Sequence, residues 1–207
     1  MKKVISLILL SLLFTGCAST KMLTNENHKK INSIYIADEV IVPEGAFYYG
    51  PEQGIGAIFG IAGALVSETA ETKDELIVEY MKENDIDIGQ ICKEAVKNAL
   101  INNPKFSDKK IISNLNDADT ILTVEVFVFG ISQTHGFSSV YGPLLGIKAK
   151  LTDKNENIVW QDYENVSPSS RDVNAIEFDE YFKDPNNMKI RYEQAAKEVG
   201  SLMSKDM

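Results

Sequence analysis

The residue best placed for chemistry is a cysteine thiol near the start of the chain. Cys17 follows the small pair Thr15-Gly16, which ends an apolar run from Val4 to Phe14 that is preceded by Lys2-Lys3. Charged, apolar and small-residue regions in this order are typical of a secretory signal that is cut at the small residues. This run of eleven residues is too short for a membrane span, which takes about 20 residues.

The stretch Leu13-Phe14-Thr15-Gly16-Cys17 resembles a bacterial lipobox, with Phe14 where leucine is usual. The resemblance implies cleavage between Gly16 and Cys17 and attachment of a diacylglycerol to the Cys17 thiol. Two or more acyl chains give durable membrane attachment, whereas one binds only marginally. The alternative is an ordinary secretory signal with a fortuitous cysteine. Ala18-Ser19 follows without an aspartate, which resembles the default for outer-membrane sorting and implies a domain facing the periplasm.

These features divide the chain into three parts. Residues 1–16 are the predicted signal peptide, and residues 17–30 the lipidated amino terminus with a polar, aperiodic and therefore flexible tether. Residues 31–207 are long enough for a single periplasmic domain with its own core. That domain contains a glycine-rich apolar insertion at 50–66.

Charge and cysteine content argue against a nucleic-acid partner and against a disulfide. Removing residues 1–16 leaves 19 basic residues (21 minus Lys2 and Lys3) against 30 acidic ones, a net charge of −11. Such a balance argues against nucleic acid as a partner, because phosphates demand a basic surface. Cys92 is the only other cysteine, so the mature chain has no intrachain disulfide, and we expect Cys92 to be a buried apolar residue of a helix.

Signals for catalysis are weak. The two histidines, His28 and His135, are isolated, whereas a metal site needs three or four ligands at helical or hairpin spacing. Gly136 to Val140 misses the nucleophile-elbow pattern at its last position, and Asp85 to Gly89 lacks the glutamate of a calcium loop. We therefore expect no enzyme, no cofactor and no metal site, and we expect His135 and Tyr141 to lie on the surface.

Periodicity predicts an α+β domain: a mixed, mostly antiparallel sheet with helices packed on one face, in two layers. The alternation is clearest in the long strand at 119–132, where Leu122, Val124, Val126 and Val128 should share one face and Phe127 and Phe129 the other. We expect Trp160 to pack in the sheet or core. The predicted strands are 31–42, 110–113, 119–132, 144–152 and 158–163, and the predicted helices are 72–83, 88–100, 175–182 and 187–203.

The glycine-rich insertion is the strongest local candidate for a functional contact. From Gly54 to Val66 every residue is glycine or apolar. As a helix, these thirteen residues would span only about 20 Å, short of the ~30 Å hydrocarbon core. Gly56, Phe59, Gly60 and Gly63 form the candidate association or membrane contact, since small residues four apart allow close approach of backbones. Internal packing in the domain or an oligomer, and contact with the membrane surface, both remain open.

The lipobox, the strand Ile34-Tyr35-Ile36, the helix at 88–100, Ala118 to Leu122 and the hairpin from Leu151 to Trp160 together resemble small α/β envelope lipoproteins. The curli-secretion lipoprotein and the amino-terminal domain of TolB are the nearest named types. The resemblance implies a non-enzymatic accessory or assembly component of the cell envelope, with an envelope protein or a second copy as partner. The alternative is a small-ligand or lipid-binding carrier that uses the glycine-rich segment as a lid.

Overall fold

A single mixed sheet forms the centre of the domain. The computed structural model describes residues 20–51, 72–136, 138–168 and 175–207. Within these ranges seven strands form one sheet in the order β3-β1-β4-β5-β6, with β2 beside β4 and β7 beside β5. The strands are β1 (Ser33–Ile41), β2 (Phe47–Tyr49), β3 (Lys110–Ile112), β4 (Thr120–Gln133), β5 (Val140–Asp153), β6 (Ile158–Val166) and β7 (Ile176–Glu177).

Parallel and antiparallel pairing divide the sheet into two parts. β1 runs parallel to β3 and β4, and β2 is parallel to β4, whereas β4, β5 and β6 form an antiparallel meander. The long antiparallel pairs follow from the short connections, because a hairpin can join only antiparallel neighbours. In the β5–β6 turn, the Asp153 carboxylate accepts the backbone N–H groups of Asn155 and Asn157 at 2.8 and 2.9 Å.

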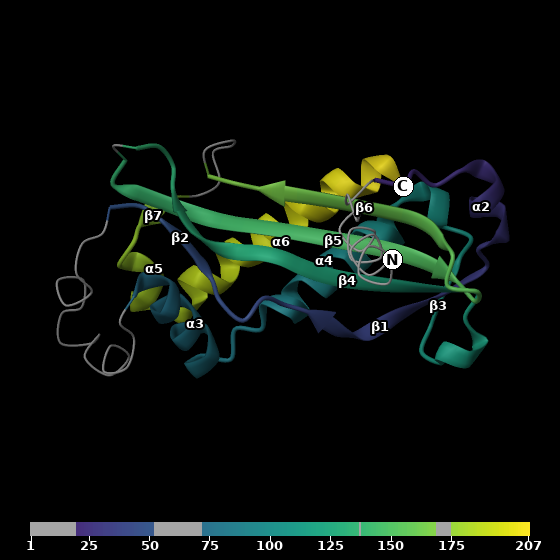
Figure 1. The fold of residues 1–207 in the computed structure, drawn as a ribbon, viewed down its shortest axis with the longest axis horizontal. Helices are drawn as coiled ribbons and strands as arrows, with labels where there is room; N and C mark the ends of the chain where they lie inside the picture. Colours follow the sequence, from purple (N-terminus) through teal and green to yellow (C-terminus); the bar gives the residue numbers. More distant parts are fainter. Residues whose placement is uncertain (1–19, 52–71, 137, 169–174) are drawn as a thin grey trace, which may run out of the picture.

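The two longest helices, α4 and α6, lie behind this sheet in Figure 1, which gives the two-layer α+β architecture predicted from the sequence. α4 and α6 cross the same face and pack on each other, while the opposite face of the strands is not covered by a helix in the described ranges. The helices are α2 (Asn25–Lys30), α3 (Lys73–Glu83), α4 (Ile88–Asn102), α5 (Glu180–Lys183) and α6 (Pro185–Asp206), with short 3-10 turns η3 (Pro104–Phe106) and η4 (Leu115–Asp117).

Local signals explain where the main helices begin. Asp87 is the predicted N-cap of α4, and its carboxylate accepts the N–H of Gln90 at 2.9 Å. Asp184 does the same for α6 by accepting the N–H of Asn186 at 2.9 Å, and Pro185 at the first position lacks the N–H that would otherwise be unpaired.

The core lies between the sheet and the α4–α6 pair. Leu122, Ile147, Val96 and Leu100 are fully or almost fully buried there. Burial of each such side chain stabilises the fold by about 1.5–3 kcal/mol. Trp160 and Cys92 are also buried, as predicted. α4 and α6 approach closely at Gly200, where a Cβ would lie only 3.0 Å from the Ala95 carbonyl oxygen.

The predicted faces of β4 are wrong beyond Val126, because the strand contains a bulge. Val126 pairs with Ile147 and Val128 with Gly146, so that Phe127 is an extra residue without a partner strand residue. The bulge reverses the alternation. Phe129, predicted on the outer face, is therefore buried, while Val128 is only half-buried.

The ends of the sheet also differ from the prediction. β5 begins at Val140, so Tyr141 is a buried strand residue and not a surface loop residue, whereas His135 is exposed as expected. The predicted helix at 175–182 is the short strand β7 followed by α5. β2 was not predicted, because three residues are too few to show a period.

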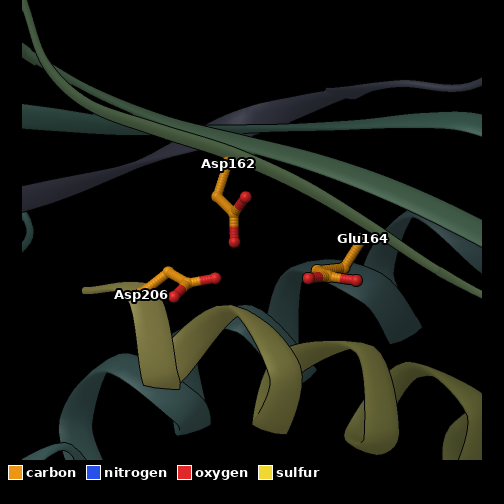
Figure 2. A group of neighbouring side chains, drawn as sticks. All are labelled: Asp162, Glu164 and Asp206. Carbon is orange, nitrogen blue, oxygen red and sulfur yellow. The ribbon is translucent and has the colours of Figure 1, made fainter. Parts of the chain in front are cut away.

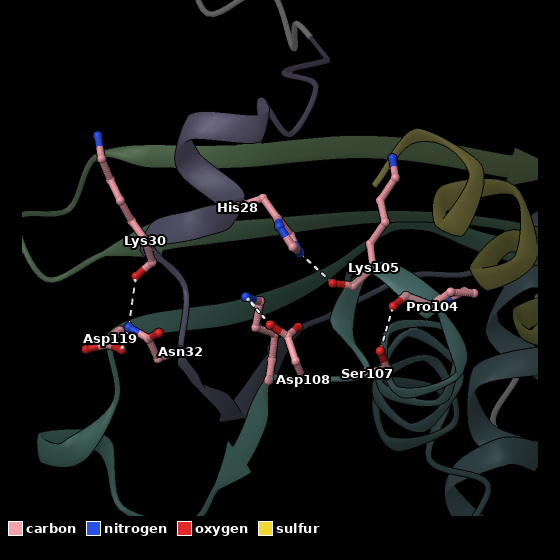
Figure 3. Close-up of polar contacts among 9 residues, drawn as sticks. His28, Lys30, Asn32, Pro104, Lys105, Ser107, Asp108 and Asp119 are labelled. Carbon is pink, nitrogen blue, oxygen red and sulfur yellow. Dashed lines mark hydrogen bonds and ion pairs between the residues drawn. The ribbon is translucent and has the colours of Figure 1, made fainter.

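The described part of the predicted tether, residues 20–30, is not a free linker. Lys21 forms a two-way backbone bridge with Gln161 of β6, with N–O distances of 2.7 and 3.0 Å. Helix α2 follows, and Figure 3 shows the His28 ring reaching the Lys105 carbonyl of η3. The same ring meets Phe106 edge-on at 5.7 Å between centroids. The amino-terminal segment is thus docked on the domain from Lys21 onward.

Candidate functional site

The uncovered face of the sheet exposes a group of large apolar side chains, which we call the open-face patch. It consists of Ile41, Phe47, Tyr49, Phe127 and Tyr163. Their exposed fractions run from 39% for Tyr163 to 63% for Ile41. All five are large apolar side chains, which soluble domains usually bury.

Strand register relates two members of the patch through one cross-strand row that spans four strands. Ile41 of β1 pairs with Glu125 of β4, Glu125 with Lys148 of β5, and Lys148 with Tyr163 of β6. One cross-strand row therefore carries an apolar residue at each end. Glu125 and Lys148 in its middle form an ion pair of 3.4 Å, which neutralises both charges within the patch.

Phe127 lies on the uncovered face beside a glycine of the neighbouring strand. A Cβ built at Gly146 would lie 2.4 Å from the Phe127 ring, so only glycine leaves room for the ring to lie over β5. The bulge turns the next residue, Val128, toward the same face, so that both side chains lie beside Gly146. Phe47 and Tyr49 extend the patch along β2, opposite Gly130 and Ser132.

The residues on either side of the undescribed range 52–71 contact one another. We call this group, which consists of Tyr48, Pro51 and Lys73, the base of the glycine-rich segment. The Lys73 ammonium donates hydrogen bonds to the Pro51 carbonyl (2.9 Å) and the Tyr48 hydroxyl (3.0 Å), and it lies 4.6 Å from the centroid of the Tyr48 ring. Lys73 is only 8% exposed. The contacts of one buried cation therefore hold the two ends of the segment together.

Aromatic side chains surround this base. Tyr48 stacks on Tyr141 at 6.1 Å between centroids, and Phe178 meets both rings at 5.1 and 5.5 Å. Burial, and secondly the hydrogen bond with Tyr141, raises the pKa of the Tyr48 hydroxyl, so it stays protonated at neutral pH. The Tyr181 hydroxyl donates to the Tyr141 carbonyl at 3.1 Å and ties α5 to the same cluster.

The candidate residues taken from the sequence lie outside the described residues. These are Gly16 and Cys17 at the cleavage and lipidation site, and Gly56, Phe59, Gly60 and Gly63 in the glycine-rich segment. The structure describes only what flanks them: Thr20 onward for the first group, and the base at Tyr48, Pro51 and Lys73 for the second.

Sequence reasoning missed the open-face patch. The alternation in β4 did place Phe127 on the face opposite to that of Leu122, and this is the face that the helices leave uncovered. The patch as a whole depends on which face the helices cover and on the unpredicted strand β2.

A groove of about 950 Å³ lies between α4 and α6. Its lining includes Asp87, Glu94, Lys189, Glu193 and Lys197 beside the methyl groups of alanines. So many charged groups do not suit the acyl chains of a lipid. This groove therefore does not support the alternative of a lipid-binding carrier.

Comparisons with known proteins give distant structural likenesses. No protein-family model matches the chain, and no curated protein does. Protein XCC0632 from Xanthomonas campestris is 14% identical with a TM-score of 0.43, and each chain is covered over 89% of its length. A PelC dodecamer from Paraburkholderia phytofirmans is 13% identical with a TM-score of 0.36, covering 90% of this chain and 92% of that one.

A minor lipoprotein from Acinetobacter baumannii is 10% identical with a TM-score of 0.40, over 84% of this chain and 89% of that one. At these scores the likeness transfers no function to this chain, and the resemblance to the curli-secretion and TolB types stays a prediction. None of the helices in the described ranges combines the length and apolar character of a membrane span.

Proposed function

We propose that the chain is a non-enzymatic assembly component of the bacterial cell envelope. It is anchored in the outer membrane through lipidated Cys17, and its domain faces the periplasm. The open-face patch binds an envelope protein or a second copy of the chain. The sequence features that support the anchor are the lipobox-like stretch ending at Cys17 and the Ala18-Ser19 pair that follows it.

The observation that carries the proposal is the open-face patch itself. Five large apolar side chains lie on one side of a sheet whose other side is already covered by α4 and α6. Scattered exposed apolar residues are ordinary, but several of them gathered on one face of a sheet favour an interaction surface. Aromatic side chains are also enriched in protein–protein interfaces, where they supply contact area with little loss of conformational freedom.

The docked amino-terminal segment supports a defined orientation on the membrane. Only four peptide units separate Cys17 from Lys21, which limits the distance between their Cα atoms to about 14 Å. Lys21 is hydrogen-bonded to Gln161, which lies in the same cross-strand row as Thr123 of β4. The base of the glycine-rich segment is level with Ile131, about 25 Å further along β4 at 3.3 Å per residue. In this orientation the base of the glycine-rich segment lies in the part of the domain away from the anchor.

The glycine-rich segment belongs to the same proposal as a second contact. Gly56, Phe59, Gly60 and Gly63 would allow close approach of a partner backbone. The Lys73 contacts support this role, because they restrain both ends of the segment and lower the entropy lost when it binds.

The test uses two isoleucines that are chemically matched and lie on opposite layers. Ile41 belongs to the open-face patch, and Ile190 lies on α6 with an exposed fraction of 47%. Ile41→Asp and Ile190→Asp are expressed as full-length chains and recovered by crosslinking and pull-down from intact envelopes. We expect Ile41→Asp to lose the crosslinked partner or self-association and Ile190→Asp to keep it. Equal retention by both variants would contradict a role for the open face.

A third variant, Gly60→Leu, addresses the second contact. We expect it to give a smaller species by light scattering with unchanged circular dichroism. An unchanged species would remove the segment from the interface without removing the open-face patch.

A further inference from the structure

Three carboxylates from two elements meet at the end of α6, beneath the sheet. Asp162 and Glu164 belong to β6 and lie on its helix-facing side, opposite Ala149 and Ile147 of β5. Asp206 is the last residue of α6. One carboxylate oxygen of each residue lies within 4.8 Å of the other two, and Figure 2 shows all three side chains directed toward a common space.

Asp162 is the informative member of this group. Its side chain is 2% exposed, and one oxygen, Oδ1, accepts the backbone N–H of Tyr163 at 2.9 Å. The other oxygen, Oδ2, is buried and has no hydrogen-bond partner in the described chain. Figure 2 shows the Asp162 carboxylate extending from the strand toward the space between Glu164 and Asp206. A buried acceptor without a partner costs about 1–3 kcal/mol, and more when it is charged.

The charges around Asp162 make the lack of a partner more costly. Burial raises the pKa of Asp162, and the charges of Glu164 and Asp206 raise it further, against the opposing influence of the Tyr163 N–H and the Thr20 hydroxyl. Three carboxylates at this separation repel each other, and burial weakens the screening of that repulsion by water. Such a group is stabilised by taking up either a proton or a cation.

We propose that Asp162, Glu164 and Asp206 bind a divalent cation of the calcium type. All three ligands are carboxylate oxygens, which suit a hard cation and not zinc or copper, whose sites in proteins use histidine and cysteine. An ion that holds its ligands at about 2.3–2.6 Å can join oxygens up to about 5 Å apart. Mg²⁺ holds its ligands at about 2.0–2.1 Å and demands closer, more regular oxygens. The carboxyl-terminal end of α6 also carries a partial negative charge that favours a cation.

The strongest rival is a buried water molecule. The indole Nε1 of Trp160, two residues before Asp162 on the same face of β6, is a buried donor without a partner in the described chain. A water could join this donor to a protonated Asp162. The two arrangements differ in one measurable respect, because only the first responds to calcium.

The bound cation would join the end of α6 to β6 beside the Lys21–Gln161 bridge. It would therefore fix the part of the domain that receives the amino-terminal segment. Removal of calcium should loosen this part first.

Trp160 supplies a direct reporter of the site, because it is the only tryptophan of the chain. Two residues of a strand place it about 7 Å from Asp162, which is close enough for it to transfer excitation energy to Tb³⁺, a luminescent substitute for Ca²⁺. The full-length chain in detergent is first treated with EDTA and then titrated with TbCl₃ under tryptophan excitation. We expect saturable luminescence that excess CaCl₂ abolishes. Absence of luminescence in the wild type, together with no effect of calcium on melting, would overturn the site in favour of the buried water.

Thermal melting supplies the second measurement. With a Kd of about 10⁻⁴ M, in the range of weaker calcium sites, about 10 mM CaCl₂ multiplies the ratio of folded to unfolded chain roughly 100-fold. We expect the wild type to melt at higher temperature in CaCl₂ than in EDTA, and to respond less to MgCl₂. An equal response to both ions would contradict the assignment to calcium.

Variants separate binding from simple packing. Asp162→Asn should lose the calcium response yet melt above the wild type in EDTA, because it removes a buried charge. Glu193→Gln, an exposed position on α6, should respond like the wild type. Asp206→Asn is the second test should Asp162→Asn fail to fold, and we expect calcium binding at least 10-fold weaker. A full calcium response in either Asp162→Asn or Asp206→Asn would overturn the proposal.

Discussion

Gly130→Ala should detach β2 from the sheet and so displace the base of the glycine-rich segment. A Cβ at position 130 would lie 1.8 Å from the Phe47 carbonyl oxygen and 2.6 Å from its carbonyl carbon. These are backbone atoms, so no rotation of a side chain can relieve the overlap. β4 cannot yield, because the Gly130 carbonyl accepts a 2.8 Å hydrogen bond from the buried Tyr192 hydroxyl and the residue is paired with Leu144 of β5.

The expected loss of stability is roughly 2–5 kcal/mol. Overpacking contributes about 1–3 kcal/mol, and each lost β2–β4 hydrogen bond adds about 0.5–1.5 kcal/mol. A domain of this size loses about 2–4 °C in melting temperature per kcal/mol. Thermal melting of the full-length chain by circular dichroism therefore measures the effect easily.

Gly45→Ala is the matched control. Position 45 lies in the turn before β2, has no atom within 4 Å of a built Cβ, and has a negative φ. We expect no loss of stability there, or a gain of about 0.4–1 kcal/mol from the stiffer unfolded chain. If Gly130→Ala has the same melting temperature as Gly45→Ala, the close approach of β2 to β4 is wrong.

Three further results are expected. Leu100→Ala, at a fully buried position of α4, should cost about 2–5 kcal/mol, and a melting temperature within a degree or so of wild type would show that the helix face is misassigned. Burial, with a further contribution from Asp87, raises the pKa of the Cys92 thiol, so mass spectrometry should find it modified by a maleimide only after denaturation; rapid labelling of the native chain would refute its burial. Because the pKa of Asp162 is higher in the folded chain than its ordinary value of 3.8, the folded state binds the proton more tightly. In EDTA, wild type should therefore gain stability relative to Asp162→Asn as the pH falls from neutral toward about 4. If the difference in stability between the two proteins does not change with pH, the raised pKa of Asp162 is contradicted.

Long, strongly periodic elements were predictable from the sequence. The stripe of α4 and the cap at Asp87 follow from residues that act within one helix, and both were confirmed. The hairpin of β5 and β6 was confirmed as well, because alternation of lysine with apolar residues marks a half-exposed strand.

The features that were missed depend on contacts distant in sequence. The bulge at Phe127 is defined by the partner strand and by the space that Gly146 leaves, and neither is visible in the pattern of β4 alone. The short strand β2 exists because Gly130 admits its backbone.

The acidic group was missed for the same reason. Asp162 and Glu164 are distant from Asp206 in the sequence and meet only when α6 packs under β6. The open-face patch likewise appears only once the helices have covered the other face.

Site-specific photocrosslinking in intact envelopes tests the central claim most directly. A photoreactive amino acid replaces Phe127 in the open-face patch or, as a control, Glu193 on the exposed side of α6. The account predicts a defined crosslinked adduct from position 127 and none from position 193, in chains that fractionate with the membrane through Cys17. Adducts only from position 193, or none from position 127 in membrane-anchored protein, would contradict it.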